Sequence, residues 1–177
     1  MLTLYYKPGS CSFAAHIVLE ESGEPYVLRP VDLAGGEQRT EAFLKINPKG
    51  RVPVLILDDG EPLAENTAIL PYLGKRFGLW PVELLAEAKA LSLIGFFAAS
   101  VHPAFAHIAV TQRYSADSAA FPAIREAGKK MFRHISGKST VCLLDANGFM
   151  TATPCSTHMV CGFTPWACDL SCPWANL

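Results

Sequence analysis

Strand-like and helix-like hydrophobic patterns follow one another in the first half of the chain. Apolar runs with a period near two predict strands, and apolar residues three or four positions apart predict helices. In chain order we expect a strand at 2–6, a helix at 12–22, a strand at 26–31, a short helix at 37–46, a strand at 54–57, an edge strand at 61–63 and a helix ending about 77–78. This order predicts a small mixed sheet with helices packed on its faces.

The first predicted helix has a clear apolar spacing and a clear end. Phe13, Ala14, Ile17 and Val18 fall on one side of it, and Gly23 is the stop signal. We therefore expect these four side chains to form its apolar face.

The second half of the chain is mostly helical in pattern. Helices are predicted from Val82 to about Phe97 and from 121 to 135. Residues 90–112 carry no Asp, Glu, Lys or Arg, which resembles a membrane span. Pro103 would break a helix there, so the sequence favours a buried helix followed by a turn over a membrane span.

Composition excludes several classes of partner. The chain has 177 residues and a net charge of −1, with no basic run and no acidic tail. This balance argues against nucleic acid or an anionic membrane as the main partner. No apolar leader segment with a cleavage site begins the chain, so we expect a cytoplasmic protein.

Cysteine usage is uneven along the chain. Cys11 stands alone in the first part, and five further cysteines lie between 142 and 172. The spacings of His158 with Cys161 and of Cys168 with Cys172 are a weak zinc signal. We expect no metal ion, and no disulfide framework in the absence of an export signal.

Cys11 follows a predicted strand and a Pro-Gly turn and precedes a predicted helix. Unpaired N–H groups and the positive end of the helix dipole favour an anion at such a place. The site can hold a thiolate with a lowered pKa, or accept the hydrogen bond of another thiol. The alternative is a small apolar residue packed under a turn.

Several motifs in residues 1–77 agree with one family. They are Tyr-Tyr-x-Pro-Gly-Ser-Cys-Ser at 5–12, Val-Asp-Leu at 31–33, Ile-Asn-Pro-Lys-Gly-Arg-Val-Pro-Val-Leu at 46–55, Leu-Asp-Asp-Gly at 57–60, Ala-Glu-Asn-Thr-Ala-Ile at 64–69 and Tyr-Leu at 72–73. Together they resemble the bacterial beta-class glutathione S-transferases. The resemblance implies a thioredoxin-like α/β domain at 1–78 that binds glutathione, an all-α domain at 82–177, and a homodimer.

The resemblance also assigns site residues. Cys11 matches the active-site cysteine beside the glutathione sulfur, and Val52-Pro53 matches a cis-proline step whose Val52 backbone would pair with the ligand. The alternative is a trans proline at a strand start. Glu65 and Asn66 match the pair that holds the γ-glutamyl amine and carboxylate, although many relatives carry Ser or Gly in place of Asn66. Helix capping alone is the other explanation of this pair.

Three further glutathione contacts are expected from Ser10, Arg51 and His102. His102 lies in a segment similar to the one whose histidine faces the family's active site. Relatives often have Lys where Pro103 stands, so one possible contact to a glutathione carboxylate is absent. The alternative is that His102 only fills a helix end.

The pattern changes after about residue 135. Residues 136–177 contain only three charged side chains (Lys138, Asp145 and Asp169), and helical periodicity fades. Fragments such as Cys142-Leu143-Leu144 echo family phrases, but the capping Asp of the second domain's core helix is missing. We expect this tail to be a scrambled or frame-shifted version of the family C-terminus, which stops short.

The sequence thus predicts a cytoplasmic transferase that adds glutathione, as co-substrate, to a small hydrophobic electrophile. The presence of Cys11 keeps open a glutathione-dependent thiol–disulfide oxidoreductase. The altered tail keeps open a partly folded, non-catalytic product of a damaged coding sequence.

Overall fold

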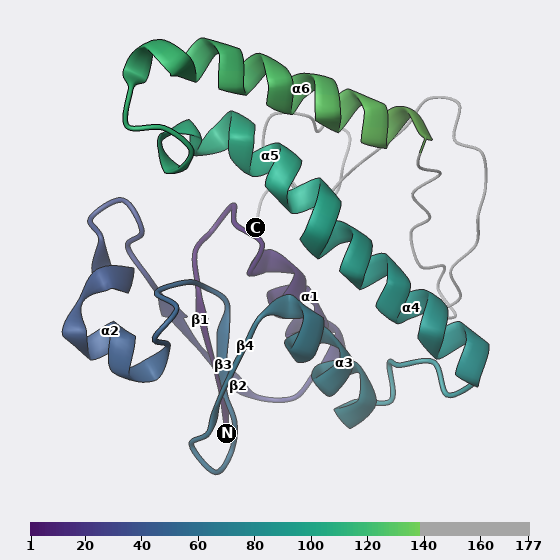
Figure 1. The fold of residues 1–177 in the computed structure, drawn as a ribbon. Helices are drawn as coiled ribbons and strands as arrows, with labels where there is room; N and C mark the ends of the chain where they lie inside the picture. The colour runs from purple at the N-terminus through teal and green to yellow at the C-terminus, as the bar shows by residue number, and fades with distance from the viewer. Residues whose placement is uncertain (139–177) are drawn as a thin grey trace, which may run out of the picture. The chain divides into compact units, whose positions relative to one another are not determined.

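The computed structural model describes residues 1–138, with side chains to residue 135. Two compact units are present (Figure 1), one formed by Met1–Trp80 and the other beginning at Pro81. The atypical tail expected at 136–177, with its proposed frame shift and its weak zinc signal, lies outside the described residues except for 136–138, which end the last described helix. The extent of the second domain to 177 therefore stays a prediction.

The first unit is built on a four-stranded mixed sheet. Its strands are β1 (Leu2–Tyr6), β2 (Tyr26–Pro30), β3 (Val54–Ile56) and β4 (Pro62–Ala64), in the order β2-β1-β3-β4. β1 pairs in parallel with β2, and β3 is antiparallel to both β1 and β4. The parallel pair needs a crossover, which α1 (Phe13–Ser22) supplies. The predicted thioredoxin-like arrangement, with its edge strand, is confirmed.

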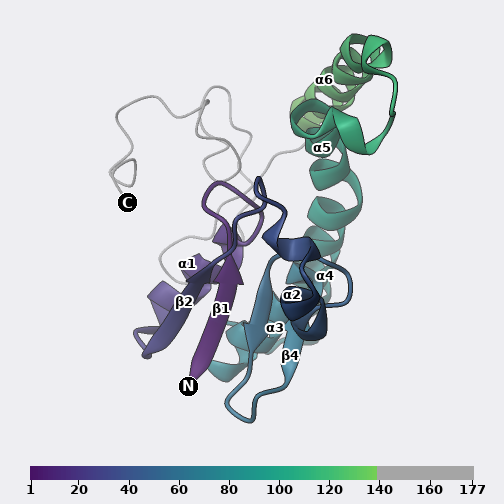
Figure 2. The same ribbon diagram turned by 90° about the vertical axis from the view of Figure 1, so that its left-hand side faces the viewer.

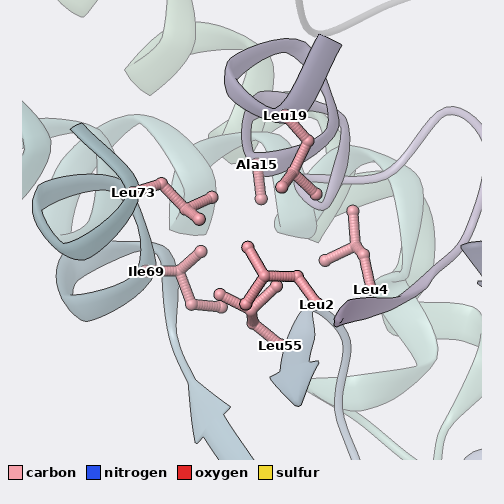
Figure 3. Close-up of a cluster of buried hydrophobic side chains, with 7 residues drawn as sticks. All are labelled: Leu2, Leu4, Ala15, Leu19, Leu55, Ile69 and Leu73. Atoms are coloured by element: carbon pink, nitrogen blue, oxygen red, sulfur yellow. The ribbon is translucent and has the colours of Figure 1, made fainter. Parts of the chain in front are cut away.

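One face of the sheet packs against α1 and α3 (Asn66–Arg76). Figure 3 shows apolar side chains from these three elements meeting in a single cluster, which consists of Leu2, Leu4, Ala15, Leu19, Leu55, Ile69 and Leu73. Each large member contributes about 1.5–3 kcal/mol when it is fully buried. This cluster fixes both helices relative to the sheet.

The buried face of α1 differs from the predicted one. Ala15 and Leu19 are fully buried, whereas Phe13 and Ile17 are each 43% exposed. The prediction was wrong for these two residues because α1 is apolar on nearly every side. Spacing alone then selects no face, and contact with the sheet and α3 decides which side chains are buried.

The other face of the sheet carries a smaller cluster of Val31, Phe43, Val52 and Val54. The single helix predicted at 37–46 is a 3₁₀ turn (Glu37–Arg39) followed by α2 (Glu41–Ile46). Thr40 separates them because its extended backbone ends the turn, and its hydroxyl accepts a hydrogen bond from the Phe43 N–H to cap α2. Figure 1 shows α2 on the other side of the sheet from α1 and α3, and in Figure 2, viewed from that side, α2 lies in front.

The second unit consists of helices in its described part. They are α4 (Leu84–Phe96), a π-helical turn (Phe97–Val101), α5 (His102–Ala109), two 3₁₀ turns (Thr111–Arg113 and Ser118–Ala120) and α6 (Phe121–Lys138). α5 and α6 pack closely, and a Cβ at Gly128 would lie only 2.8 Å from the His107 Cβ. Glycine at 128 is what allows this approach.

The predicted turn at Pro103 does not form, and this expectation was wrong. α4, the π turn and α5 run on without a break, and Pro103 occupies the first turn of α5. Inside a continuous helix a proline removes one hydrogen bond and crowds the carbonyl four residues earlier. The π turn directly before Pro103, in which the His102 N–H bonds to the Phe97 oxygen five residues back, accommodates it without ending the helix. α5 buries Ala104 and Ala106, but α4 buries none of its residues, contrary to the predicted buried helix.

The run Leu84–Ala109 has the length and composition of a membrane span. In the described part of the chain no other helix meets that test. A core helix of a soluble protein meets it as well, so the run alone is weak support for a membrane location.

Candidate functional site

Cys11 lies where the sequence predicts, in the loop between β1 and α1, two residues before the first residue of the helix. The next residue, Ser12, is the N-cap of α1 and is fully buried. Ser12 Oγ lies 3.1 Å from the Lys7 nitrogen and 3.2 Å from the Lys7 oxygen. These contacts close the loop on itself and hold Cys11 at the helix start.

Ser10 takes part in the same network. Its hydroxyl lies 2.7 Å from Ser12 Oγ and accepts a hydrogen bond from the Ser12 N–H at 3.3 Å. In this structure Ser10 therefore stabilises the loop that carries Cys11. Its predicted contact with glutathione stays a prediction.

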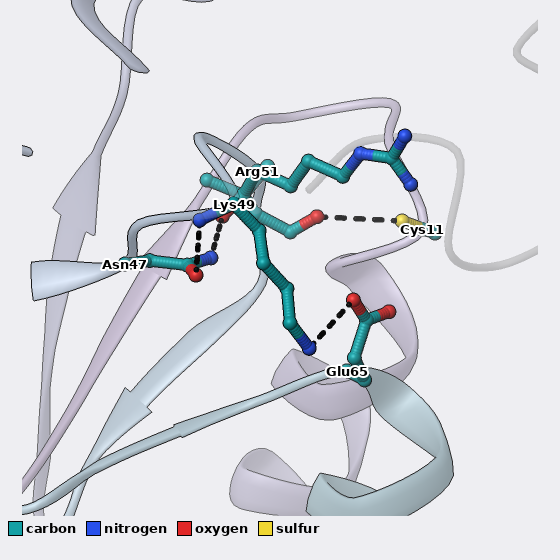
Figure 4. Close-up of polar contacts among 6 residues, drawn as sticks. Cys11, Asn47, Lys49, Arg51 and Glu65 are labelled. Atoms are coloured by element: carbon teal, nitrogen blue, oxygen red, sulfur yellow. Dashed lines mark hydrogen bonds and ion pairs between the residues drawn. The ribbon is translucent and has the colours of Figure 1, made fainter. Parts of the chain in front are cut away.

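A second loop, at 47–53, meets the first at the thiol. Cys11 Sγ donates a hydrogen bond to the Val52 carbonyl oxygen, with a separation of 3.7 Å (Figure 4). The Val52–Pro53 peptide bond is cis, so this expectation is confirmed. The structure thus places Cys11 beside the backbone of Val52 although 41 residues separate them in the chain.

The loop at 47–53 is held by Asn47, whose role the sequence analysis missed. Its side chain is buried, donates through Nδ2 to the Arg51 carbonyl oxygen at 2.8 Å, and accepts through Oδ1 from the Lys49 N–H at 3.1 Å. An Asn that bonds the backbone two residues later is a known turn former. The Asn47-Pro48 dipeptide was the signal that could have identified it.

The third contributor is the start of α3. Asn66 Nδ2 donates to the Cys11 carbonyl oxygen at 2.7 Å. Glu65, just before the helix, has a positive φ of 73°, which is uncommon for a residue other than glycine. Its half-exposed carboxylate pairs with Lys49 Nζ at 3.3 Å. Cys11, Val52, Glu65 and Asn66 are therefore brought together from three separate segments.

Two predicted site residues stand apart from this network. Arg51 is exposed, and Figure 4 shows its side chain extending from the turn towards the Cys11 end of the site. His102 is the first residue of α5 and belongs to the other compact unit. Glutathione contacts from both residues stay predictions.

No cluster of three or more His, Cys, Asp or Glu side chains suited to a metal ion occurs within residues 1–138. The expectation that the protein needs no metal is not tested by this observation.

The first unit matches the family model described as glutathione S-transferase, N-terminal domain, over residues 9–76. A glutathione transferase homologue from Sulfitobacter, solved with bound glutathione, is 35% identical, with a TM-score of 0.73 over 77% of this chain and 67% of that one. The chain belongs to the glutathione S-transferase family. A beta-class member from Sphingomonas chungbukensis is 32% identical, with a TM-score of 0.64 over 76% of this chain and 66% of that one.

A curated relative of this family member is also bacterial. Glutathione S-transferase GstA of Escherichia coli O157:H7 is 39% identical over 109 residues, which are 59% of this chain and 54% of that protein. The chain thus spans about half the length of this relative. The predicted family, fold class and resemblance to beta-class enzymes are confirmed.

Proposed function

We propose that this glutathione S-transferase homologue binds glutathione at the Cys11 site and transfers it to a small hydrophobic electrophile. The observation that carries the proposal is the meeting of Cys11 Sγ, the Val52 carbonyl and the Asn66 side chain at the start of α1. A homologue solved with bound glutathione supports the same ligand.

Each group has a chemical part to play. The Val52 backbone would pair with the ligand backbone as an added strand does. The Glu65 carboxylate would receive the γ-glutamyl ammonium, and the N–H groups at the start of α3 would receive its carboxylate. The Glu65–Lys49 pair is exposed, so an incoming ammonium can displace Lys49 at small cost.

In the proposed reaction the glutathione thiol loses its proton to solvent and the thiolate sulfur attacks the electrophile. A carbon–sulfur bond forms while the electrophile's leaving group departs with its electron pair, or its double bond accepts the pair. The Cys11 thiol and the N–H groups at the start of α1 would stabilise the glutathione thiolate by hydrogen bonding.

Calorimetric titration of the protein with reduced glutathione tests the first step, with Cys11→Ala as the comparison. We expect binding in the micromolar to millimolar range, about −8 to −4 kcal/mol. A well-folded sample that binds no glutathione would overturn the proposal. A screen of small apolar electrophiles then tests transfer itself.

The cysteine at this position favours a second candidate, a glutathione-dependent thiol–disulfide oxidoreductase. The Cys11 thiolate would attack a glutathione mixed disulfide, form a new disulfide with one sulfur and release the other as a thiol. A second glutathione would then release Cys11 and leave as oxidised glutathione. Reductase activity that disappears in Cys11→Ser, without electrophile conjugation, would favour this candidate.

The proposal also includes a cytoplasmic location and a homodimer. Membership of the family supports both. Sedimentation of the purified chain would measure the dimer directly. A monomer over the whole working concentration range would remove that part while leaving glutathione binding untouched.

A further inference from the structure

Asn66 has an unusual hydrogen-bonding arrangement at the start of α3. Its Nδ2 group donates to the Cys11 carbonyl oxygen at 2.7 Å, across 55 residues of sequence. Its Oδ1 atom is buried and, among the residues that the structure describes, has no hydrogen-bond partner. A buried amide oxygen without a partner is unfavourable, so another interaction must hold the side chain in place.

The chemistry of the two groups fixes the orientation of the amide. The Cys11 carbonyl oxygen is an acceptor and needs a donor opposite it. Turning the amide over would place Oδ1 against another oxygen and lose the short bond. The orientation that lets Nδ2 donate to Cys11 is therefore also the one that leaves Oδ1 without a partner among the described residues.

The hydrogen bond from Asn66 and the hydrogen bond to Val52 involve different parts of Cys11. Asn66 holds the main chain of Cys11, and the thiol donates to the Val52 carbonyl oxygen at 3.7 Å. Ser12 holds the loop on the other side through Lys7. Cys11 is thus fixed by contacts from its own loop, from the loop at 47–53 and from α3.

We infer that Asn66 is a positioning residue, which ties the main chain of Cys11 to α3 and so sets where the thiol lies. The inference adds to the proposed function, on which its relevance to catalysis rests, but the tie itself is independent of glutathione. It gives Asn66 a role that ligand binding or helix capping alone would not supply.

The test measures Cys11 without any ligand. The rate of alkylation by iodoacetamide is followed from roughly pH 5 to 10, around the ordinary thiol pKa, and is read by mass spectrometry on the peptide that contains Cys11. This separates Cys11 from the cysteines at 142–172. The variants are Asn66→Ala and Asn66→Asp, with Thr67→Ala as the matched control, because Thr67 is exposed in the same turn.

Asn66→Ala should alkylate at least about threefold faster at the alkaline plateau, where the thiol is fully ionised and the rate reports its accessibility. Asn66→Asp should move the midpoint of the profile to higher pH by about half a unit or more, because a nearby carboxylate disfavours the thiolate. Thr67→Ala should match the wild type in both respects.

Profiles of both Asn66 variants that match Thr67→Ala would overturn the inference, even if the variants melt at lower temperature. If Asn66→Ala does not fold, Asn66→Gly, which also lacks a side-chain donor, decides the matter: a wild-type profile in that variant refutes the inference. The proposed function fails separately, when the wild type binds no glutathione although its alkylation profile depends on Asn66.

Discussion

Asn47 Nδ2 and the Arg51 carbonyl oxygen are 2.8 Å apart, and this hydrogen bond closes the turn that leads to Val52. The Asn47 side chain is only 4% exposed, so water cannot easily replace the bond. The position of the Val52 carbonyl, which accepts from Cys11, therefore depends on a side chain that has no predicted contact with glutathione.

Asn47→Ala is expected to destabilise the first unit by about 1–3 kcal/mol, because it removes both hydrogen bonds of a buried side chain and leaves their backbone partners unpaired. Denaturant unfolding measures this loss, and calorimetry should show weaker glutathione binding. Asn47→Asp separates the two bonds, since it keeps the acceptor for the Lys49 N–H but offers no donor to Arg51, and it should therefore also be less stable than the wild type. Wild-type stability in Asn47→Ala would contradict the role of the turn.

The corrected face of α1 can be tested by a pair of truncations in the same helix. Leu19→Ala should cost about 2–5 kcal/mol, because it opens a cavity between α1, α3 and the sheet. Ile17→Ala should cost less than about 1 kcal/mol, because Ile17 is 43% exposed. Equal losses of unfolding free energy would show that the helix buries a different face.

Glu65→Gln should weaken glutathione binding about tenfold or more, which corresponds to about 1.4 kcal/mol, because the γ-glutamyl ammonium loses its charged partner. Lys49→Ala is the control: it removes the other member of the ion pair and leaves the carboxylate in place. It should change the dissociation constant by only a few-fold, since exposed pairs contribute about 0.2–1 kcal/mol. Equal binding by Glu65→Gln and the wild type would exclude Glu65 as the ammonium site.

Glu83 makes the stability of α4 depend on pH. Its carboxylate accepts hydrogen bonds from the N–H groups of Leu85 and Ala86, which holds the pKa of Glu83 below its usual value. A group with a lowered pKa stabilises the folded state above its unfolded pKa of about 4.3, and the effect is lost as pH falls through the lower folded pKa.

The difference in Tm between the wild type and Glu83→Gln should therefore be greater at neutral pH than at roughly pH 3. Thermal unfolding followed by circular dichroism at both pH values measures it. A difference in Tm that does not change with pH would show that the charge on this cap is not involved.

Local patterns were sufficient to predict the sheet and the position of the thiol. The apolar runs that become β1 and β3 are short and bounded by turn residues, so their periodicity identifies strands. The Pro-Gly turn before Cys11 likewise fixes a helix start by local chemistry. The motif around Val52-Pro53 pointed to the cis bond only through the family resemblance.

Contacts between distant segments could not be predicted in this way. The bond from Asn66 to Cys11 depends on how α3 packs against α1, and nothing in the spacing of either motif encodes it. A network of His16, Glu20 and Tyr26 was missed for the same reason. The Tyr26 hydroxyl donates to Glu20 and lies 2.9 Å from His16 Nε2, and burial together with the Glu20 bond raises the pKa of Tyr26 far above its usual value.

The π-helical turn at Phe97–Val101 has a consequence for the length of the chain at that point. Such a turn holds one residue more than an α-helix needs, and each residue of an α-helix advances it by about 100°. The π turn uses this extra residue to complete the same rotation, so deleting a single residue there would restore α-helical geometry and leave α5 close to its present phase relative to α4. The side of α5 that meets Gly128 of α6 would keep facing it. A one-residue deletion in the α-helical part of the same run would instead rotate α5 by about 100° and turn that side away, so the π turn is where this long helix best tolerates the loss of a residue.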